Sequence, residues 1–219
     1  MDVFGRRWDH HTEKITAAWH ETVHEGDTVV IPGDVSWGMT LEEASADLHF
    51  LNNLPGRKII GRGNHDYWWS TLRKMQAFFA EQSITTIDLL YNNAYPVGNI
   101  TVCGSRGWWN DPKISPGDTD YQKIINREVI RLEMSLTEAE RIGGIPVVFL
   151  HFPPVWRDVV CREIVDLLHA HHITRCYYGH LHMAYDVPAA FDYEGITFTI
   201  ASSDYLNFVP LPVADMYGI

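Results

Sequence analysis

The stretch Arg62-Gly63-Asn64-His65-Asp66 follows directly on the apolar run Lys58-Ile59-Ile60-Gly61. A β-branched run that stops at glycine predicts a buried strand that leads into a tight loop. The glycine permits backbone angles that a side chain would forbid, so the next residues can turn back over the end of the strand. Asn64, His65 and Asp66 then place an amide oxygen, an imidazole and a carboxylate in one loop. Such a set can hold a metal ion and move a proton, so this loop is the centre of a candidate site.

Three further apolar runs end in side chains with the same kind of chemistry. The polar groups that follow these runs are Asp34, His151, and the pair His180 and His182. Strands that alternate with helices predict an α/β chain. In such chains ligands bind beyond the carboxyl ends of the strands. The four groups are therefore expected to meet at one place.

The hydrophobic pattern also predicts the order of the elements. Helices are predicted over residues 12–25, 40–52, 70–81, 119–142 and 162–170, and strands over 27–31, 58–61, 85–90, 99–103, 145–150, 176–178 and 196–201. Residues 95–98 are predicted to form a turn between two strands. No repeat or linker interrupts the sequence, so we expect one domain over residues 1–219.

Composition and charge restrict the class of protein. The 219 residues are 46% hydrophobic and 21% charged, as in ordinary globular domains. A formal net charge of −11 argues against nucleic acid or an anionic membrane as the main partner, because both need a basic face. Three widely spaced cysteines predict reduced, buried thiols. Without a membrane-length apolar run, or a signal-peptide core in residues 1–7, the expected location is the cytoplasm.

A competing motif lies in the first predicted helix. The segment His20-Glu21-Thr22-Val23-His24 matches the H-E-x-x-H pattern of zinc proteases. On a helical wheel its two histidines lie opposite the apolar face that contains Ile15 and Trp19. If that face is buried, the histidines point to water. A solvated histidine pair is therefore favoured over a protease site.

The four groups together resemble the calcineurin-like metallophosphoesterases. The matching motifs, in the family's order and spacing, are Gly33-Asp34, Gly63-Asn64-His65-Asp66, His151 and Gly179-His180-Leu181-His182. The similarity runs from residue 27 to about residue 204, and within the family the chain looks like small bacterial phosphohydrolases of unassigned substrate. The resemblance implies a two-sheet sandwich flanked by helices in four layers. It also implies a two-metal site at the strand ends.

The resemblance further assigns the metal ligands. Asp34 would bridge the two ions, and His182 would bind the first ion. Asn64, His151 and His180 would complete the shell of the second ion. Mixed oxygen and nitrogen ligands suit manganese, iron or zinc without choosing among them. Two such ions clamp a phosphoryl group and turn a bridging water into hydroxide near neutral pH.

The remaining expected roles are catalysis and substrate binding. The resemblance implies that His65 protonates the leaving oxygen and that Asp66 holds its tautomer. Arg106 lies in a glycine-flanked loop, where its guanidinium could grip a phosphate or form a surface ion pair. Five tryptophans that follow the motifs are interpreted as core residues rather than as a stacking surface: Trp37, Trp68, Trp69, Trp108 and Trp109.

One motif of the family is not found in this sequence. Family members begin with a strand that ends in Asp-x-His, whereas Met1-Asp2-Val3-Phe4-Gly5 looks like the sequence just after that motif. Asp9-His10-His11 has the spacing, but no apolar strand precedes it. The first ion is then left with Asp34 and His182, and a central strand is missing. We expect a fragment or wrong start of a longer protein, in preference to a weakened relative.

Three functions follow from the sequence. The first is a metal-dependent phosphoesterase, acting on a mono- or diester of a small phosphorylated substrate with two ions, or with only one in this chain. The second is an inactive or weakly active binding protein on the same fold. The third is a zinc protease that uses His20, Glu21 and His24. The natural substrate, the metal and the oligomeric state are left open.

Overall fold

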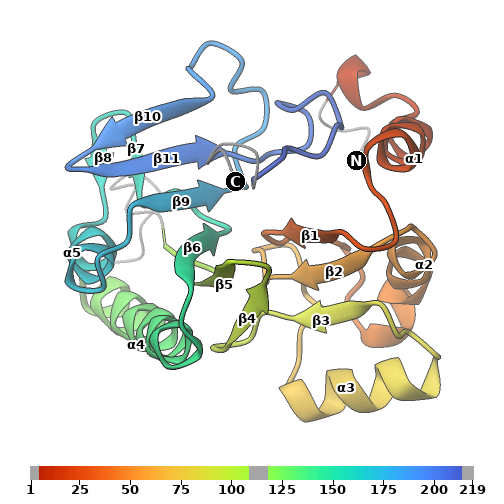
Figure 1. Cartoon of the computed structure of the whole chain (residues 1–219), viewed down its shortest axis with the longest axis horizontal. Helices are drawn as coiled ribbons and strands as arrows, with labels where there is room; N and C mark the ends of the chain where they lie inside the picture. The colour runs from red at the N-terminus through yellow and green to blue at the C-terminus, as the bar shows by residue number, and fades with distance from the viewer. Residues whose placement is uncertain (1–4, 109–117, 214–219) are drawn as a thin grey trace.

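The computed structural model describes residues 5–108 and 118–213 (Figure 1). A parallel three-stranded sheet contains β1 (Thr28–Ile31), β2 (Arg57–Ile60) and β3 (Ile87–Leu89), in the order β1-β2-β3. A second, six-stranded sheet has the order β10-β11-β9-β6-β5-β4. Its strands are β4 (Ala94–Val97), β5 (Ile100–Ser105), β6 (Ile145–Leu150), β9 (Arg175–Tyr178), β10 (Ala190–Tyr193) and β11 (Ile196–Ile200). The short strands β7 (Val155–Trp156) and β8 (Val159–Val160) form a separate hairpin.

Helices cover the outer face of each sheet (Figure 1). The helices α1 (His11–Thr22), α2 (Leu41–Asn52) and α3 (Leu72–Glu81) pack on the small sheet, and α4 (Asp118–Ile142) and α5 (Arg162–Ala170) pack on the large one. Because side chains alternate along a strand, β6 contributes to two cores. Val148 and Leu150 face the helices, whereas Val147 and Phe149 face the other sheet. The four layers that the family resemblance implied are confirmed.

Two predicted boundaries were wrong for local reasons. Residues 95–97, predicted to turn, belong to β4, which pairs antiparallel with β5. Because β4 is the end strand of its sheet, Pro96 is tolerated there despite its missing N–H. The first helix, predicted over residues 12–25, ends at Thr22 because Val23 takes an extended backbone conformation, with φ −113° and ψ 128°.

Among the described strands, β1 lies at the end of its sheet and pairs only with β2 (Figure 1). Its residues Val29, Val30 and Ile31 are only partly buried. A cavity of about 1050 Å³ runs along β1 and reaches Phe149 and Tyr177 of the large sheet. No strand of the described residues covers this edge of β1, in agreement with the predicted absence of a strand at this place.

Two expectations from composition can be compared with the structure. Cys103, Cys161 and Cys176 are all free and buried, as predicted. In the part of the chain that the structure describes, no helix has the length and apolar character needed to cross a membrane.

Candidate active site and metal centre

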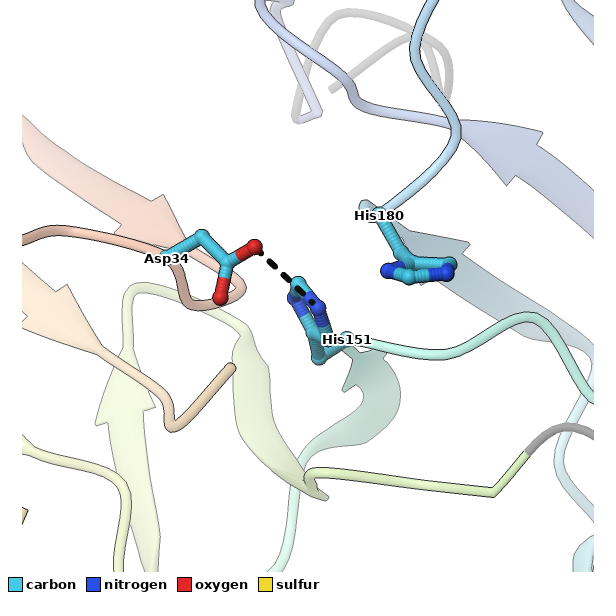
Figure 2. Close-up of side chains that lie close together, drawn as sticks. All are labelled: Asp34, His151 and His180. Atoms are coloured by element: carbon cyan, nitrogen blue, oxygen red, sulfur yellow. Dashed lines mark ion pairs between the residues drawn. The ribbon is translucent and has the colours of Figure 1, made fainter. Parts of the chain in front are cut away.

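The carboxyl ends of four strands, two from each sheet, converge at the cavity beside β1. Asp34 follows β1, Asn64 follows β2, and His151 and His180 follow β6 and β9. Asp34, His151 and His180 offer ligand atoms that all lie within 4.8 Å of one another (Figure 2). The described residues contain no second group of histidine, cysteine and carboxylate side chains that is this compact. The predicted convergence of these strand ends is therefore observed.

Asn64 and His151 meet in a way that suits a shared cation. His151 is 1% exposed, and its Nδ1 lies 3.1 Å from the carbonyl oxygen of Pro32. With Nδ1–H donating to that carbonyl, Nε2 is an acceptor and lies 2.7 Å from Asn64 Oδ1. The same Oδ1 is 3.0 Å from His180 Nδ1. Two acceptors at such a distance are stabilised by a cation between them, so the donor set fits a metal ion.

Burial prepares the site for a cation. It lowers the pKa of His151 well below the usual value, with a further contribution from the neighbouring His180. It also lowers the pKa of His180 to about 4. Both imidazoles are therefore neutral at pH 7, which is the form that binds metals. Burial raises the pKa of Asp34, and a bound cation would offset this effect.

Two glycines allow the loops after β1 and β2 to touch. A Cβ on Gly63 would lie 2.0 Å from Asp34 Oδ1. Gly33 has φ +105°, and a Cβ there would lie 2.4 Å from the backbone nitrogen of Gly63. The His65 N–H donates to Asp34 Oδ1 across the same contact, at 2.8 Å. The position of the Asp34 carboxylate therefore depends on the absence of side chains at residues 33 and 63.

We expect Gly63→Ala to lower the affinity for manganese or zinc by roughly 10- to 100-fold, which is the usual effect of substitutions that disturb the residues orienting a metal ligand. The added methyl group would have to push the Asp34 carboxylate out of the cluster. Calorimetric titration of the metal-free protein measures the effect. Gly26→Ala is the matched control, because a Cβ at Gly26 meets no atom within 4 Å. Unchanged affinity in Gly63→Ala would contradict the described ligand geometry.

Asp66 supports these loops and does not hold the tautomer of His65. Its side chain is 1% exposed. The carboxylate accepts hydrogen bonds from the backbone N–H groups of Asp34, Val35, Ser36 and Gly63 and from the indole of Trp68. The predicted role was wrong because these five donors hold the Asp66 carboxylate, and Nδ1 of His65 instead lies beside the Tyr67 hydroxyl. Asp66 instead ties the loop after β1 to the loop after β2.

His65 is contacted by two aromatic residues. Its Nδ1 lies 3.1 Å from the hydroxyl oxygen of Tyr67. Its ring stacks on Trp37, with centroids 4.5 Å apart and an angle of 24° between the planes. His65, Asp34, His180 and His182 line a small cavity of about 300 Å³. The predicted proton donor therefore lies on the same cavity as the candidate ligands.

His182 has a carboxylate partner that the sequence analysis missed. Its Nδ1 lies 3.0 Å from Oδ1 of Asp204, which is fully buried. Burial alone would raise the pKa of Asp204, but hydrogen bonds from His182, the Met183 N–H and the Tyr185 hydroxyl lower it to about 2. A carboxylate behind an imidazole leaves Nε2 as the ligand atom and orients the ring. The only signal in the sequence was an aspartate shortly after the last strand.

A family model described as Calcineurin-like phosphoesterase matches residues 8–184. The chain belongs to this family. Membership implies metal-dependent hydrolysis of phosphoesters, and the family generally binds two divalent metal ions.

Other known proteins are similar to this calcineurin-like phosphoesterase over different lengths. It is 40% identical over 58 residues to the Gene 66 protein of Mycobacterium phage L5, a match that covers 26% of this chain and only 28% of that protein. The crystal structure of TT1561 of Thermus thermophilus matches with a TM-score of 0.50 and 11% identity, over 91% of this chain and 86% of that one. A further crystal structure matches with a TM-score of 0.51, also at 11% identity, over 89% and 86% of the two chains. These structures support the fold alone.

Arg106 lies beside the candidate site rather than in the ligand cluster. Its carbonyl oxygen accepts the N–H groups of His151 and Phe152, at 3.0 and 2.9 Å. Its guanidinium lies over the rings of Trp108 and Phe152, 5.3 and 5.8 Å from their centroids. Arg106 therefore helps to place His151 through its backbone, and its contact with substrate stays a prediction.

The tryptophans of the phosphoesterase differ in their environments. Trp68 is buried, and Trp69 and Trp108 pack against the cores. Trp37 was wrongly interpreted as core, because it is 41% exposed beside His65. Trp109 lies outside the described residues.

The H-E-x-x-H segment does not form a second centre in this phosphoesterase. His20 and His24 are both exposed, and α1 ends at Thr22. His24 therefore lies beyond the helix and does not share its face with His20. Its Nδ1 instead lies 3.4 Å from the carboxylate of Asp27. The zinc-protease alternative is not supported by this geometry.

Proposed function

We propose that this protein hydrolyses a mono- or diester of a small phosphorylated substrate, with His65 as the general acid. The observation that carries the proposal is the compact set of Asp34, Asn64, His151 and His180 at four strand ends, beside His65. These four residues would hold one manganese, iron or zinc ion, and Asp34 with His182 would hold another. Such ions polarise phosphoryl oxygens and lower the pKa of bound water.

In this proposal the chain's own residues orient the substrate and move the proton. The small cavity beside His65 receives the phosphoryl group, and Arg106 attracts its charge from the adjacent loop. As the oxygen of a hydroxide ion forms a bond to phosphorus, the bond from phosphorus to the leaving oxygen breaks, and the leaving oxygen takes a proton from the protonated His65 imidazole. The imidazole becomes neutral, and the leaving group departs as an alcohol.

We expect His65→Asn to retain bound metal and to slow hydrolysis of alkyl phosphates by roughly 10²–10⁴-fold, the usual range of general-acid catalysis. Nitrophenyl phosphate should be much less affected, because nitrophenolate leaves without needing a proton. Steady-state kinetics on both substrates, with metal analysis of the same samples, test the assignment. Equal losses on the two substrates, or a loss of metal, would count against it.

A second candidate function is a binding protein without turnover. What favours it is that, among the residues that the structure describes, the resemblance assigns only Asp34 and His182 to the first ion. Two protein ligands bind a divalent ion weakly, and a single ion supplies only part of the catalytic clamp. A protein that binds metal but does not hydrolyse nitrophenyl phosphate at any metal concentration would support this second function.

A further inference from the structure

His65 is contacted on its ring face and at one ring nitrogen by two residues without an assigned role. Trp37 stacks on the imidazole, and the hydroxyl of Tyr67 lies 3.1 Å from Nδ1. The rings of His65 and Tyr67 also meet edge to face, with centroids 5.9 Å apart. We infer that Trp37 and Tyr67 are positioning residues that hold the His65 imidazole in the orientation needed for proton transfer. The inference rests on the proposed role of His65.

The backbone brings both residues to His65 in a defined way. The Tyr67 N–H donates to the His65 carbonyl at 2.9 Å, and this tight turn places the Tyr67 ring next to the imidazole. Trp37 follows Ser36, which is 3% exposed. The Ser36 N–H donates to Asp66, and its hydroxyl donates to Asp47. The residue that precedes Trp37 is therefore anchored through both its backbone and its side chain.

These contacts determine which nitrogen can serve the reaction. The Tyr67 hydroxyl occupies Nδ1, so Nε2 is the nitrogen left to give its proton to the leaving oxygen. The Trp37 indole covers one face of the ring and opposes rotation of the imidazole about its bond to Cβ. A misplacement of about 1 Å at a reacting group can cost roughly 10²-fold in rate. Loss of either contact should therefore reduce proton transfer.

Exposure separates this role from a role in the core. Trp37 is 41% exposed and Tyr67 is 49% exposed, so neither contributes the full burial of a large aromatic side chain to stability. Neither residue is among the candidate ligands. Their substitution is therefore expected to leave the fold and the metal content intact.

The test compares Tyr67→Phe and Trp37→Leu with His65→Asn, using kcat and KM for an alkyl phosphate and for nitrophenyl phosphate. Each positioning variant should lower kcat for the alkyl phosphate by roughly 3- to 30-fold, a part of the full general-acid effect. The turnover of nitrophenyl phosphate, the KM for both substrates and the bound metal should each change by less than about twofold, because none of them depends on proton transfer from His65. Trp37→Phe should restore part of the lost rate, because a phenyl ring can still stack. Tyr193→Phe, whose hydroxyl faces Arg162 away from the site, is the control.

The double variant His65→Asn with Tyr67→Phe tests whether Tyr67 acts through His65. If it does, the double variant should be no slower than His65→Asn alone, because residues that act as a unit are not additive. Additive losses, or a rise in KM instead of a fall in kcat, would overturn the inference. So would positioning variants with unchanged kcat when His65→Asn still discriminates between the substrates. If His65→Asn slows the alkyl phosphate and nitrophenyl phosphate equally, the proposed role of His65 is wrong, and the inference about Trp37 and Tyr67 falls with it.

Discussion

His151→Ala is expected to remove most of the bound manganese or zinc and to lower phosphoesterase turnover by roughly 10²–10³-fold or more, because several kcal/mol of transition-state stabilisation depend on the ions. The imidazole is 1% exposed and its Nε2 lies 2.7 Å from Asn64 Oδ1, so the substitution removes a nitrogen ligand atom from inside the cluster. Metal analysis after dialysis and the rate on nitrophenyl phosphate measure the two effects together.

His20→Ala is the control for this experiment, because His20 is an exposed histidine of α1. It should leave metal content and turnover unchanged. His180→Ala should behave like His151→Ala, since both rings contact the same Asn64 oxygen. Loss of metal in the His20 variant alone would move the metal centre to the first helix and overturn the assignment.

Fusing an apolar strand that ends in Asp-x-His ahead of residue 1 is expected to raise bound metal from about one to about two ions per chain. The melting temperature should rise by roughly 10 °C. Each buried apolar side chain adds about 1.5–3 kcal/mol to the free energy of unfolding, and each 1 kcal/mol raises the melting temperature of a protein of this size by about 2–4 °C. The cavity beside β1 has a volume of about 1050 Å³, and no strand of the described residues covers the outer edge of β1, so such a segment has a place to pair. Trp8, near the start of the described residues, contacts the His182 ring with centroids 5.3 Å apart.

Two control fusions separate cavity filling from metal binding. A strand that ends in Asn-x-Asn should keep the gain in melting temperature but not the second ion. A strand with a central proline should show neither gain, because proline disrupts pairing within a sheet. Tight binding of two ions and normal turnover by the chain without any fusion would contradict the prediction, and Asp9 and His11 would become the next candidate ligands.

The sequence predicted the features that depend on short stretches of consecutive residues, such as the positions of the strand ends. Apolar runs that stop at Pro32, Gly61 and Gly179 located the strand ends, because the length of a run and the residue that breaks it are local properties. The rule that ligands bind at the carboxyl ends of strands then brought Asp34, Asn64, His151 and His180 into one cluster. The family resemblance added the layer order, which residue spacing alone does not determine.

The features that were missed depend on contacts between distant segments. Asp66 was paired with its neighbour His65, whereas its carboxylate accepts hydrogen bonds from residues 34–36 of another loop. Asp204 supports His182 from 22 residues further along the chain. Trp37 was taken for core because large aromatic residues are usually buried, and only the fold shows that its ring covers His65. Side-chain orientation of this kind cannot be read from spacing.

The reactivity of the three buried thiols can report local unfolding of the large sheet and its helices. Burial raises the pKa of Cys103 and Cys161 to about 12 and that of Cys176 well above its usual value, so none forms the reactive thiolate at neutral pH. Cys103 and Cys176 lie in the six-stranded sheet, Cys161 lies at the start of α5, and the small sheet contains no cysteine. The rate of labelling by a thiol reagent therefore measures the opening of the large sheet and its helices separately from motions of the loops that carry Asp34 and Asn64.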